Sequence, residues 1–259
     1  MLQDRSNLSG SCHILRLRVD ATSYEDATRR VVAWARNKES RYVCVAPVST
    51  VIEAHDSAEF RRTVNGADLV TPDGMPVVWG LRICGHRSAT RVYGPDLTLS
   101  VLKAAAREAI PVGFCGGTDM VLERLVEVAK NRFPGLPVAY AYAPPFRPLS
   151  LEEDRKIVDD INASGARILF VGLGSPKQER WMGAHCGRVR AVMLGVGAAF
   201  DFLTGQKPQA PRWMQQGGLE WLFRLLTEPR RLWRRYLFGN SKFLVLFAMQ
   251  LLNLRRFET

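Results

Sequence analysis

Cysteine and histidine are scarce in this 259-residue sequence, and neither forms a recognisable metal or redox pattern. The cysteines number five, which is odd, and include no CxxC pair. We therefore expect no disulfide framework and no zinc site, and a reducing cytosol fits this usage. The four histidines show no metal-ligand spacing, and HExxH, GxSxG and D-x-D motifs are absent. The common metalloprotease and hydrolase signatures are thereby excluded.

No hydrophobic run is long enough to cross a bilayer. The N-terminal residues, MLQDRSNLSGSCHILRL, lack the apolar region of a signal peptide. The run at 243–254 has 12 residues. As a helix it would span about 18 Å, against roughly 30 Å for the hydrocarbon core. It is therefore either a helix lying in the membrane interface or a terminal helix docked on the core.

Acidic residues are few at the C-terminal end. The chain carries a net charge of +11, and residues 207–259 hold ten basic residues against three acids. These last 53 residues therefore carry +7 and the preceding 206 only +4. The asymmetry points to an anionic partner for this segment: nucleic acid, a phosphorylated substrate or an acidic lipid surface.

Short apolar runs alternate with helical patterns along most of the chain. The runs are rich in Val, Ile and Leu and are bounded by Gly or Pro, which is typical of buried parallel strands. The predicted strands are 13–19, 42–48, 67–70, 111–115, 138–142, 167–173 and 191–197. The predicted helices are 24–37, 96–108, 119–132 and 151–163. Thr118 is expected to cap the third helix, and Ser150 with Glu153 forms a capping box on the fourth.

This alternation predicts right-handed crossovers and an α/β fold with a doubly wound, mostly parallel sheet. The character of the sequence changes at 206–212, which is polar and carries two prolines. Helical patterns follow at 218–228, 229–238 and 243–254. We expect three parts: a loose N-terminus at 1–12, an α/β domain at 13–206, and a basic helical appendage at 207–259.

The acidic residue Asp73 stands where a predicted strand ends, in the sequence TPDGMP. The carboxyl ends of strands in an open parallel sheet border the ligand crevice, so Asp73 is a candidate general base for a hydroxyl. A plain turn is the alternative, since Pro-Asp-Gly is favoured turn chemistry. The motif alone favours the turn.

Two further junctions join a strand, a glycine turn and a helix. At Gly116 and Gly117, backbone N–H groups at the helix start suit a diphosphate, although an ordinary tight turn explains the glycines equally well. In GLGSPKQERW at 172–181, Lys177 suits a phosphate, and Gln178 and Glu179 suit sugar hydroxyls or a base edge. The Gly-Leu-Gly start invites a dinucleotide interpretation, but the third glycine of that fingerprint is missing.

An arginine row marks the C-terminal segment. Arg224, Arg231 and Arg234 are spaced by seven and three, so they share one face if the helix is continuous, and Pro229 can break it. Aromatic residues interleave with them: Trp221, Trp233 and Tyr236. This combination suits a lipid headgroup surface or a diphosphate better than a solvated charged face, because acids are so scarce here.

Taken in order, these segments resemble the WecG/TagA/CpsF glycosyltransferase family. The resemblance runs from about residue 14 to 245. Each motif alone is weak evidence for the family, whereas the occurrence of all of them in this order is specific. It is carried by ADLVTPDGMPVVW at 67–79, RVYGPDL at 91–97, GLGSPKQERW at 172–181, GVGAAFD at 195–201, APRW at 210–213, GLEWLFR at 218–224 and EPRRLWRRY at 228–236.

The resemblance implies a single Rossmann-like catalytic domain with a helical C-terminal appendage that meets the membrane. The implied reaction is an inverting transfer of N-acetylmannosamine or a related hexose from a UDP-sugar to a polyprenyl-diphosphate-linked sugar, in cell-envelope or exopolysaccharide synthesis. It implies no metal and no cofactor, consistent with the missing D-x-D. The expected location is peripheral, at the cytoplasmic face of the cell membrane on an anionic surface, with no nucleic-acid partner. A homo-oligomer is possible, and the resemblance leaves the oligomeric state open.

The resemblance also carries roles to individual residues. Asp73 matches the family's proposed base, and Arg91 and Gln178 match its site residues. Asp201 lies in the family's Phe-Asp motif and is expected to contact the nucleotide. The appendage arginines thought to hold a diphosphate correspond to Arg224, Arg231 and Arg234. Gly116 and Gly117 are assigned to the donor diphosphate from the helix-start argument alone.

The sequence departs from the family pattern at one place. Many members carry Thr-x-Asn where this chain has Val45 and Pro47. The departure leaves the base argument intact, weakens any statement on donor identity, and is compatible with altered or lost activity. Two other classes stay open: a nicotinamide-dinucleotide-dependent oxidoreductase of Rossmann type, suggested by Gly172-Leu-Gly174, and a nucleic-acid-binding protein, suggested by the basic tail.

Overall fold

The computed structural model describes residues 10–252, without the side chain of Arg235. The expected loose N-terminus at 1–12 lies mostly outside these residues. The chain forms two compact units, each assembled from separated stretches. Among the described residues, the first unit comprises 10–23, 45–93 and 209–252, and the second comprises 24–44 and 94–208. The C-terminal segment thus belongs to the same unit as the sequence around Asp73.

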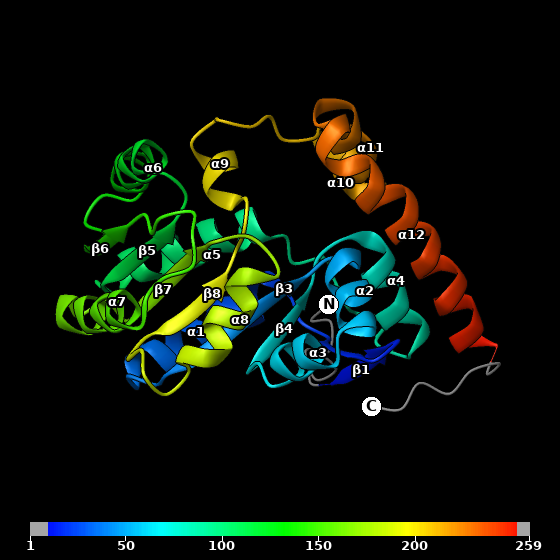
Figure 1. Ribbon diagram of the computed structural model, residues 1–259, viewed down its shortest axis with the longest axis horizontal. Helices are drawn as coiled ribbons and strands as arrows, with labels where there is room; N and C mark the ends of the chain where they lie inside the picture. The colour runs from blue at the N-terminus through cyan, green and yellow to red at the C-terminus, as the bar shows by residue number, and fades with distance from the viewer. Residues whose placement is uncertain (1–9, 253–259) are drawn as a thin grey trace, which may run out of the picture. The chain divides into compact units, whose positions relative to one another are not determined.

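A six-stranded sheet with strand order β4-β3-β8-β7-β5-β6 organises the fold, and helices flank it (Figure 1). The strands are β3 (Arg41–Ala46), β4 (Leu69–Pro72), β5 (Val112–Gly116), β6 (Val138–Tyr142), β7 (Ile168–Gly172) and β8 (Val192–Gly195). The pairs β3–β8, β8–β7, β7–β5 and β5–β6 are parallel. The predicted α/β fold with a mostly parallel sheet is confirmed.

Four helices of the second unit match the predicted ranges: α1 (Tyr24–Arg36), α5 (Gly94–Arg107), α6 (Asp119–Arg132) and α7 (Leu151–Ser164). The helix expected after the glycine turn at 172–174 is α8 (Lys177–His185), and the sequence pattern does not predict α9 (Ala199–Leu203). The Thr118 side chain accepts a hydrogen bond from the N–H of Val121, and Ser150 and Glu153 form the capping box. Both predicted caps are confirmed, because the hydroxyl two or three residues before free N–H groups satisfies them locally.

The predicted strand at 13–19 is wrong. Residues 11–20 form an antiparallel hairpin of β1 (Ser11–Ile14) and β2 (Leu17–Asp20), with Ser11 opposite Asp20, in a separate two-stranded sheet. Leu15 reverses the chain with a φ of 59°, in the left-handed region. The residues on both sides of this turn are apolar and buried, so the run reads as one continuous strand.

A disulfide joins this hairpin to the end of α4 (Met75–Ile83), between Cys12 and Cys84. The expectation of no disulfide is therefore wrong for this pair. The two cysteines are 72 residues apart and no local spacing links them. Their Cα atoms lie 6.5 Å apart only because the hairpin packs beside α4.

Four helices of the first unit have no counterpart in the predictions: α2 (Val48–Asp56), α3 (Ala58–Asn65), α4 (Met75–Ile83) and α10 (Arg212–Gln216). The β-branched start of α2 reads as the end of the preceding strand, which the prediction extended to Val48. The chain instead turns at Pro47, which is the residue before the helix and is held at a φ suited to helix entry.

The C-terminal segment forms α10 (Arg212–Gln216), α11 (Glu220–Thr227) and α12 (Pro229–Leu251). The break between α11 and α12 falls at Pro229, as its ring requires. The helices predicted at 229–238 and 243–254 are one 23-residue helix, at about 1.5 Å per residue roughly 35 Å long. None of the described helices is long and apolar enough to span a bilayer.

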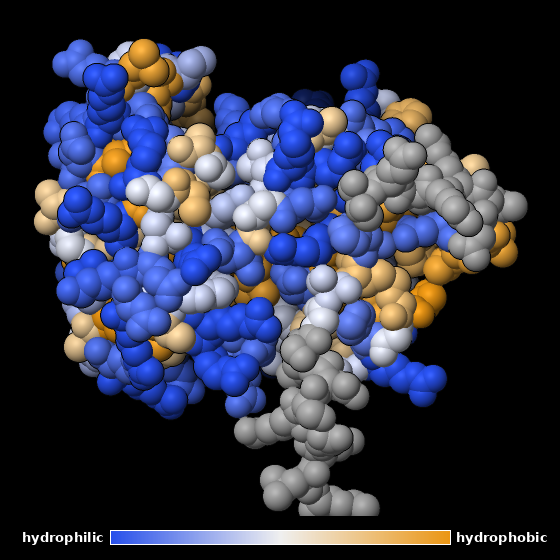
Figure 2. All heavy atoms as spheres, turned by 90° about the horizontal axis from the view of Figure 1, so that it is seen from below, coloured by the Kyte–Doolittle hydropathy of each residue, from blue (hydrophilic) through white to orange (hydrophobic). Residues whose placement is uncertain are grey.

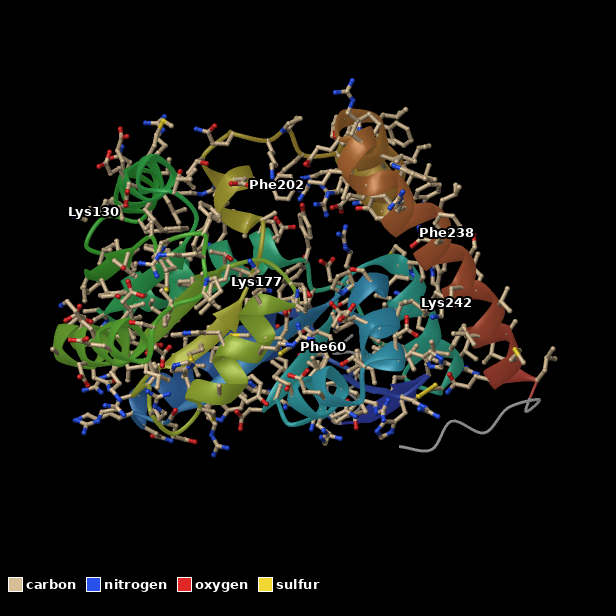
Figure 3. All side chains as sticks on the ribbon, viewed as in Figure 1. Phe60, Lys130, Lys177, Phe202, Phe238 and Lys242 are labelled. Carbon is tan, nitrogen blue, oxygen red and sulfur yellow. A yellow bond between two sulfur atoms is a disulfide. The ribbon has the colours of Figure 1, made fainter. Side chains whose placement is uncertain are left out.

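One face of α12 packs on α2, within the first unit. Four apolar side chains on this face are buried: Leu232, Phe243, Leu246 and Phe247. Lys242, labelled in Figure 3, pairs with Asp56 of α2 at 2.6 Å. For this face, the described part of the run at 243–254 is therefore a helix docked on the core, as one of the two alternatives predicted. Leu244 and Val245 are exposed.

Candidate active site

A pocket in the first unit collects residues from the end of β4 and from the C-terminal helices. Its lining comes from the start of α2, the β4–α4 turn, Arg91 and the three helices after residue 209. The lining residues are Pro47, Val48, Ser49, Asp73, Gly74, Met75, Pro76, Arg91, Gln215, Gly218, Glu220, Trp221, Arg224, Tyr236 and Asn240. Three predicted site residues, Asp73, Arg91 and Arg224, therefore meet in one pocket.

Asp73 is fixed at the carboxyl end of β4 by its own backbone. Its N–H donates to the carbonyl of Ala46 at the end of β3, at 3.1 Å. The next residue, Gly74, has a φ of 95° and starts α4, which only glycine does without strain. The turn interpretation is therefore confirmed, and this turn places Asp73 in the lining of the pocket, where the predicted role of a base would require it.

The Asp73 carboxylate is held on one oxygen only. Arg91 donates to Oδ1 from Nε at 3.0 Å and from Nη2 at 2.9 Å. Among the described residues and side chains, none donates a hydrogen bond to Oδ2. Because the side chain is 16% exposed and lines the pocket, this second oxygen can meet a bound group. A carboxylate oriented in this way is suited to accept a proton.

A second carboxylate, Glu220, completes the cluster. It lies in the first turn of α11 and accepts from Nη2 of Arg91 at 2.5 Å, with 12% of its side chain exposed. Glu220 is one of three acids among the ten basic residues of 207–259, and no motif marks it as a site residue. The scarcity of acids was the available signal, since an acid retained among many cations is a candidate for a specific pair.

The electrostatics of the cluster follow from partial burial and shared charges. Burial lowers the pKa of Arg91, but the carboxylates of Asp73 and Glu220 outweigh this and hold it above its usual range. Burial, followed by the charge of Asp73, raises the pKa of Glu220 against the opposing effect of Arg91 and Arg224. Burial, then Glu220 and Asp73, also raise the pKa of Tyr93, so its phenol stays protonated at neutral pH.

Aromatic rings frame the charged groups. The Arg91 guanidinium carbon lies 4.3 Å from the centre of the Tyr93 ring, a cation–π arrangement that restricts the side chain further. Trp221 and Tyr236 line the pocket with their ring centres 6.3 Å apart. The pocket thus combines a proton acceptor, two arginines and an apolar aromatic wall.

The other two arginines of the predicted row lie outside this pocket lining. Arg231 pairs with Glu228 at 2.5 Å and is about half exposed. The Arg234 guanidinium lies 5.2 Å from the Trp233 ring centre. Both are on α12, whereas Arg224 is on α11, so the condition of one continuous helix is not met.

The remaining predicted residues belong to the second unit. Gln178 and Glu179 are buried in the first turn of α8, which begins at Lys177 (Figure 3). The Gln178 amide donates to Glu179 at 3.0 Å and accepts from the N–H of Gly197 at 3.0 Å. These bonds brace the turn after β8. Asp201, on α9, pairs with Lys207 at 2.7 Å.

Gly116 and Gly117 allow close packing at the ends of β5 and β7. Their φ angles are 126° and 75°, and a Cβ on Gly116 would lie 2.5 Å from the backbone carbon of Gly172. The glycines are therefore required by backbone conformation and by contact with the neighbouring strand, whatever else this turn binds.

We expect Gly116→Ala to lower the free energy of unfolding by about 2 kcal/mol, from the unfavourable φ and the clash with β7. Urea denaturation measures this, with Gly187→Ala as the control, since a Cβ there has open space and the φ of 85° is also positive. Equal losses in the two variants would show that φ alone matters and that the contact with Gly172 does not.

The departure at Val45 and Pro47 affects one wall of the pocket. Pro47 lines it next to Val48 and Ser49, whereas Val45 is buried in β3. A ring and an aliphatic side chain therefore stand at this wall, and Ser49 supplies a hydroxyl.

Two comparisons with known proteins bear on the function of this pocket. A family model described as "Glycosyl transferase WecG/TagA/CpsF family" matches residues 12–257. A protein of Bacillus spizizenii, named N-acetylglucosaminyldiphosphoundecaprenol N-acetyl-beta-D-mannosaminyltransferase, is 32% identical over 197 residues. That match covers 76% of this chain and 74% of the relative.

Proposed function

Since this chain belongs to the WecG/TagA/CpsF family of glycosyltransferases, we propose that it transfers a sugar from a UDP-sugar to a polyprenyl-diphosphate-linked sugar, with inversion at the anomeric carbon. The donor sugar is N-acetylmannosamine or a related hexose, and the product enters cell-envelope polysaccharide synthesis. The name of the Bacillus relative supports the acceptor class and the sugar type. Family membership also favours this function over a nicotinamide-dependent oxidoreductase or a nucleic-acid-binding protein.

The observation that carries the proposal is the Asp73 carboxylate. Its side chain lines the pocket, one of its oxygens is fixed by Arg91, and the other accepts no hydrogen bond from the described residues. In the proposed step, the acceptor hydroxyl gives its proton to Oδ2 while its oxygen attacks the anomeric carbon. The bond from that carbon to the UDP oxygen breaks, and UDP leaves with the electron pair.

The leaving diphosphate needs positive charge or N–H donors. Arg224 is the pocket residue best suited to this, and Arg231 and Arg234 remain proposed diphosphate ligands on α12. On the donor side we retain the following as proposals: Gly116, Gly117, Gln178, Glu179 and Asp201. The side chains of Gln178 and Glu179 already bond to each other, so contact with a sugar would exchange that bond.

The direct test is UDP release from UDP-N-acetylmannosamine in the presence of a short-chain lipid-diphosphate N-acetylglucosamine acceptor. We expect turnover that depends on both substrates, and we expect a chelator such as EDTA to leave it unchanged, because we propose that the enzyme needs no metal. Turnover abolished by EDTA and restored by a divalent cation would contradict metal independence. The absence of UDP release with any UDP-hexose would contradict the function.

We also propose that the C-terminal helices bind an anionic membrane surface from the cytoplasmic side. Several apolar side chains of α11 and α12 are more than 60% exposed: Leu226, Leu237, Phe238, Leu244 and Val245. Figure 2 shows apolar surface at the right, the side on which the C-terminal half of α12 lies in Figure 1. Exposed apolar residues beside arginines are typical of helices that lie in a membrane interface.

Replacement of Leu237 by Gln and Phe238 by Glu tests the membrane proposal. Both side chains are over 60% exposed, so we expect the fold to be kept and sedimentation with phosphatidylglycerol liposomes to fall at least threefold. Phe146→Glu is the matched control, because Phe146 is 83% exposed in the second unit. Equal loss of liposome binding in the control, or none in the double variant, would contradict the proposal.

A further inference from the structure

We propose that Glu220 is a positioning residue that counterbalances Arg91 and thereby keeps the Asp73 carboxylate able to accept a proton. The inference rests on the function proposed above. It concerns a residue that neither the motif analysis nor the family comparison assigns to the site.

The geometry shows one guanidinium shared by two carboxylates. Nη2 of Arg91 lies 2.9 Å from Asp73 and 2.5 Å from Glu220. An arginine committed to a single carboxylate stabilises the ionised form and resists its protonation. A second carboxylate on the same nitrogen divides that interaction and places a negative charge beside Asp73. Both effects favour uptake of a proton by Asp73.

The charge distribution after proton transfer leads to the same conclusion. Before the step, the carboxylates of Asp73 and Glu220 carry two negative charges, and Arg91 carries one positive charge. After it, Asp73 is neutral, and Arg91 remains paired with Glu220 inside a partly buried cluster. Without Glu220, protonation of Asp73 would leave the guanidinium without a carboxylate partner in this cluster, which is costly away from bulk water.

The groups facing Glu220 come from each neighbouring element. Asp73 follows β4, Arg91 and Tyr93 lie in the segment before α5, and Arg224 is one turn further along α11. Tyr236 of α12 lines the same pocket. Arg224 therefore offsets part of the negative charge, but the bond to Arg91 is the specific link between Glu220 and Asp73.

Stability alone does not explain an acid at this position. Burial and the charge of Asp73 raise the pKa of Glu220, which means that its ionised form is disfavoured by the fold. A raised folded-state pKa gives stability that is present in acid and lost as pH rises through that pKa. We therefore expect Glu220→Gln to melt at the same temperature as the wild type or higher at pH 7.5.

The test is the pH dependence of kcat in Glu220→Gln. We expect kcat to fall about tenfold with little change in KM, and the acidic limb of the kcat profile to move by about one unit to lower pH. Glu220→Asp keeps the negative charge, so we expect the acidic limb of its kcat profile to lie at the same pH as in the wild type. Glu59→Gln, an exposed acid on α3 of the same unit, is the charge-matched control and should change neither value.

The outcomes separate this inference from the proposed function. A wild type that releases no UDP would overturn the proposed function. An active wild type with an unshifted limb in Glu220→Gln would overturn the inference and leave the function in place. A Glu220→Gln variant that melts at lower temperature or fails to fold would assign Glu220 a structural role and would also overturn the inference.

Discussion

Asp73→Asn is expected to lower kcat by about 10²- to 10⁴-fold, the usual contribution of a positioned general base. The amide has almost the same shape and keeps an oxygen for Arg91, so the pocket should stay intact. It cannot take the acceptor proton at neutral pH. Because the lost interaction belongs to the transition state, KM for the donor and the acceptor should change only modestly. Steady-state UDP release with both substrates varied measures the two parameters.

The control for this variant is Asp96→Asn. Asp96 is exposed in the first turn of α5, and its loss removes the same charge outside the pocket. Its kcat should stay within twofold of the wild type. Turnover of Asp73→Asn within about threefold of the wild type would remove Asp73 from the role of base.

Arg91→Met is expected to lower the free energy of unfolding by about 3 kcal/mol, because it leaves two partly buried carboxylates without their cation. The two side chains that depend on Arg91 are only 16% and 12% exposed. Activity should fall at least 100-fold as well, since Asp73 loses the contact that orients it.

The loss of stability in Arg91→Met is expected to depend on pH. Without Arg91, the burial of Glu220 and the charge of Asp73 still raise the pKa of Glu220, and its main opposing partner is gone. Folding then binds a proton, so the stability deficit of Arg91→Met should grow as pH rises from about 4 to 8. Thermal melts across this range measure it, with exposed Arg87→Met as the control, expected within about 0.5 kcal/mol. A deficit that is constant with pH would show that packing, not charge, explains the loss.

The helical C-terminal segment illustrates what composition can and cannot predict. The excess of cations sets the residues after 206 apart in composition, although residues 209–252 belong to the same compact unit as residues 45–93. Pro229 marks the boundary between α11 and α12. The row Arg224, Arg231 and Arg234 is nevertheless divided by that boundary. Its first member lines the pocket, and the other two contact Glu228 and Trp233. Spacing describes neighbours on one helix and carries no information across a break.

The sequence by itself determined the α/β class, the parallel strands, the caps at Thr118 and Ser150, and the carboxylate at the end of β4. These features depend on local patterns: apolar runs with glycine or proline ends, hydroxyls before free N–H groups, and strand polarity that brings carboxyl ends to one edge. Only the tertiary structure decided the hairpin at 11–20, the Cys12–Cys84 bond and the cluster of Asp73, Arg91 and Glu220. Arg91 and Glu220 are 129 positions apart, and their contact exists because the C-terminal helices pack in the same unit as β4. A contact between residues so far apart depends on how the helices pack, which one sequence does not encode in any local pattern.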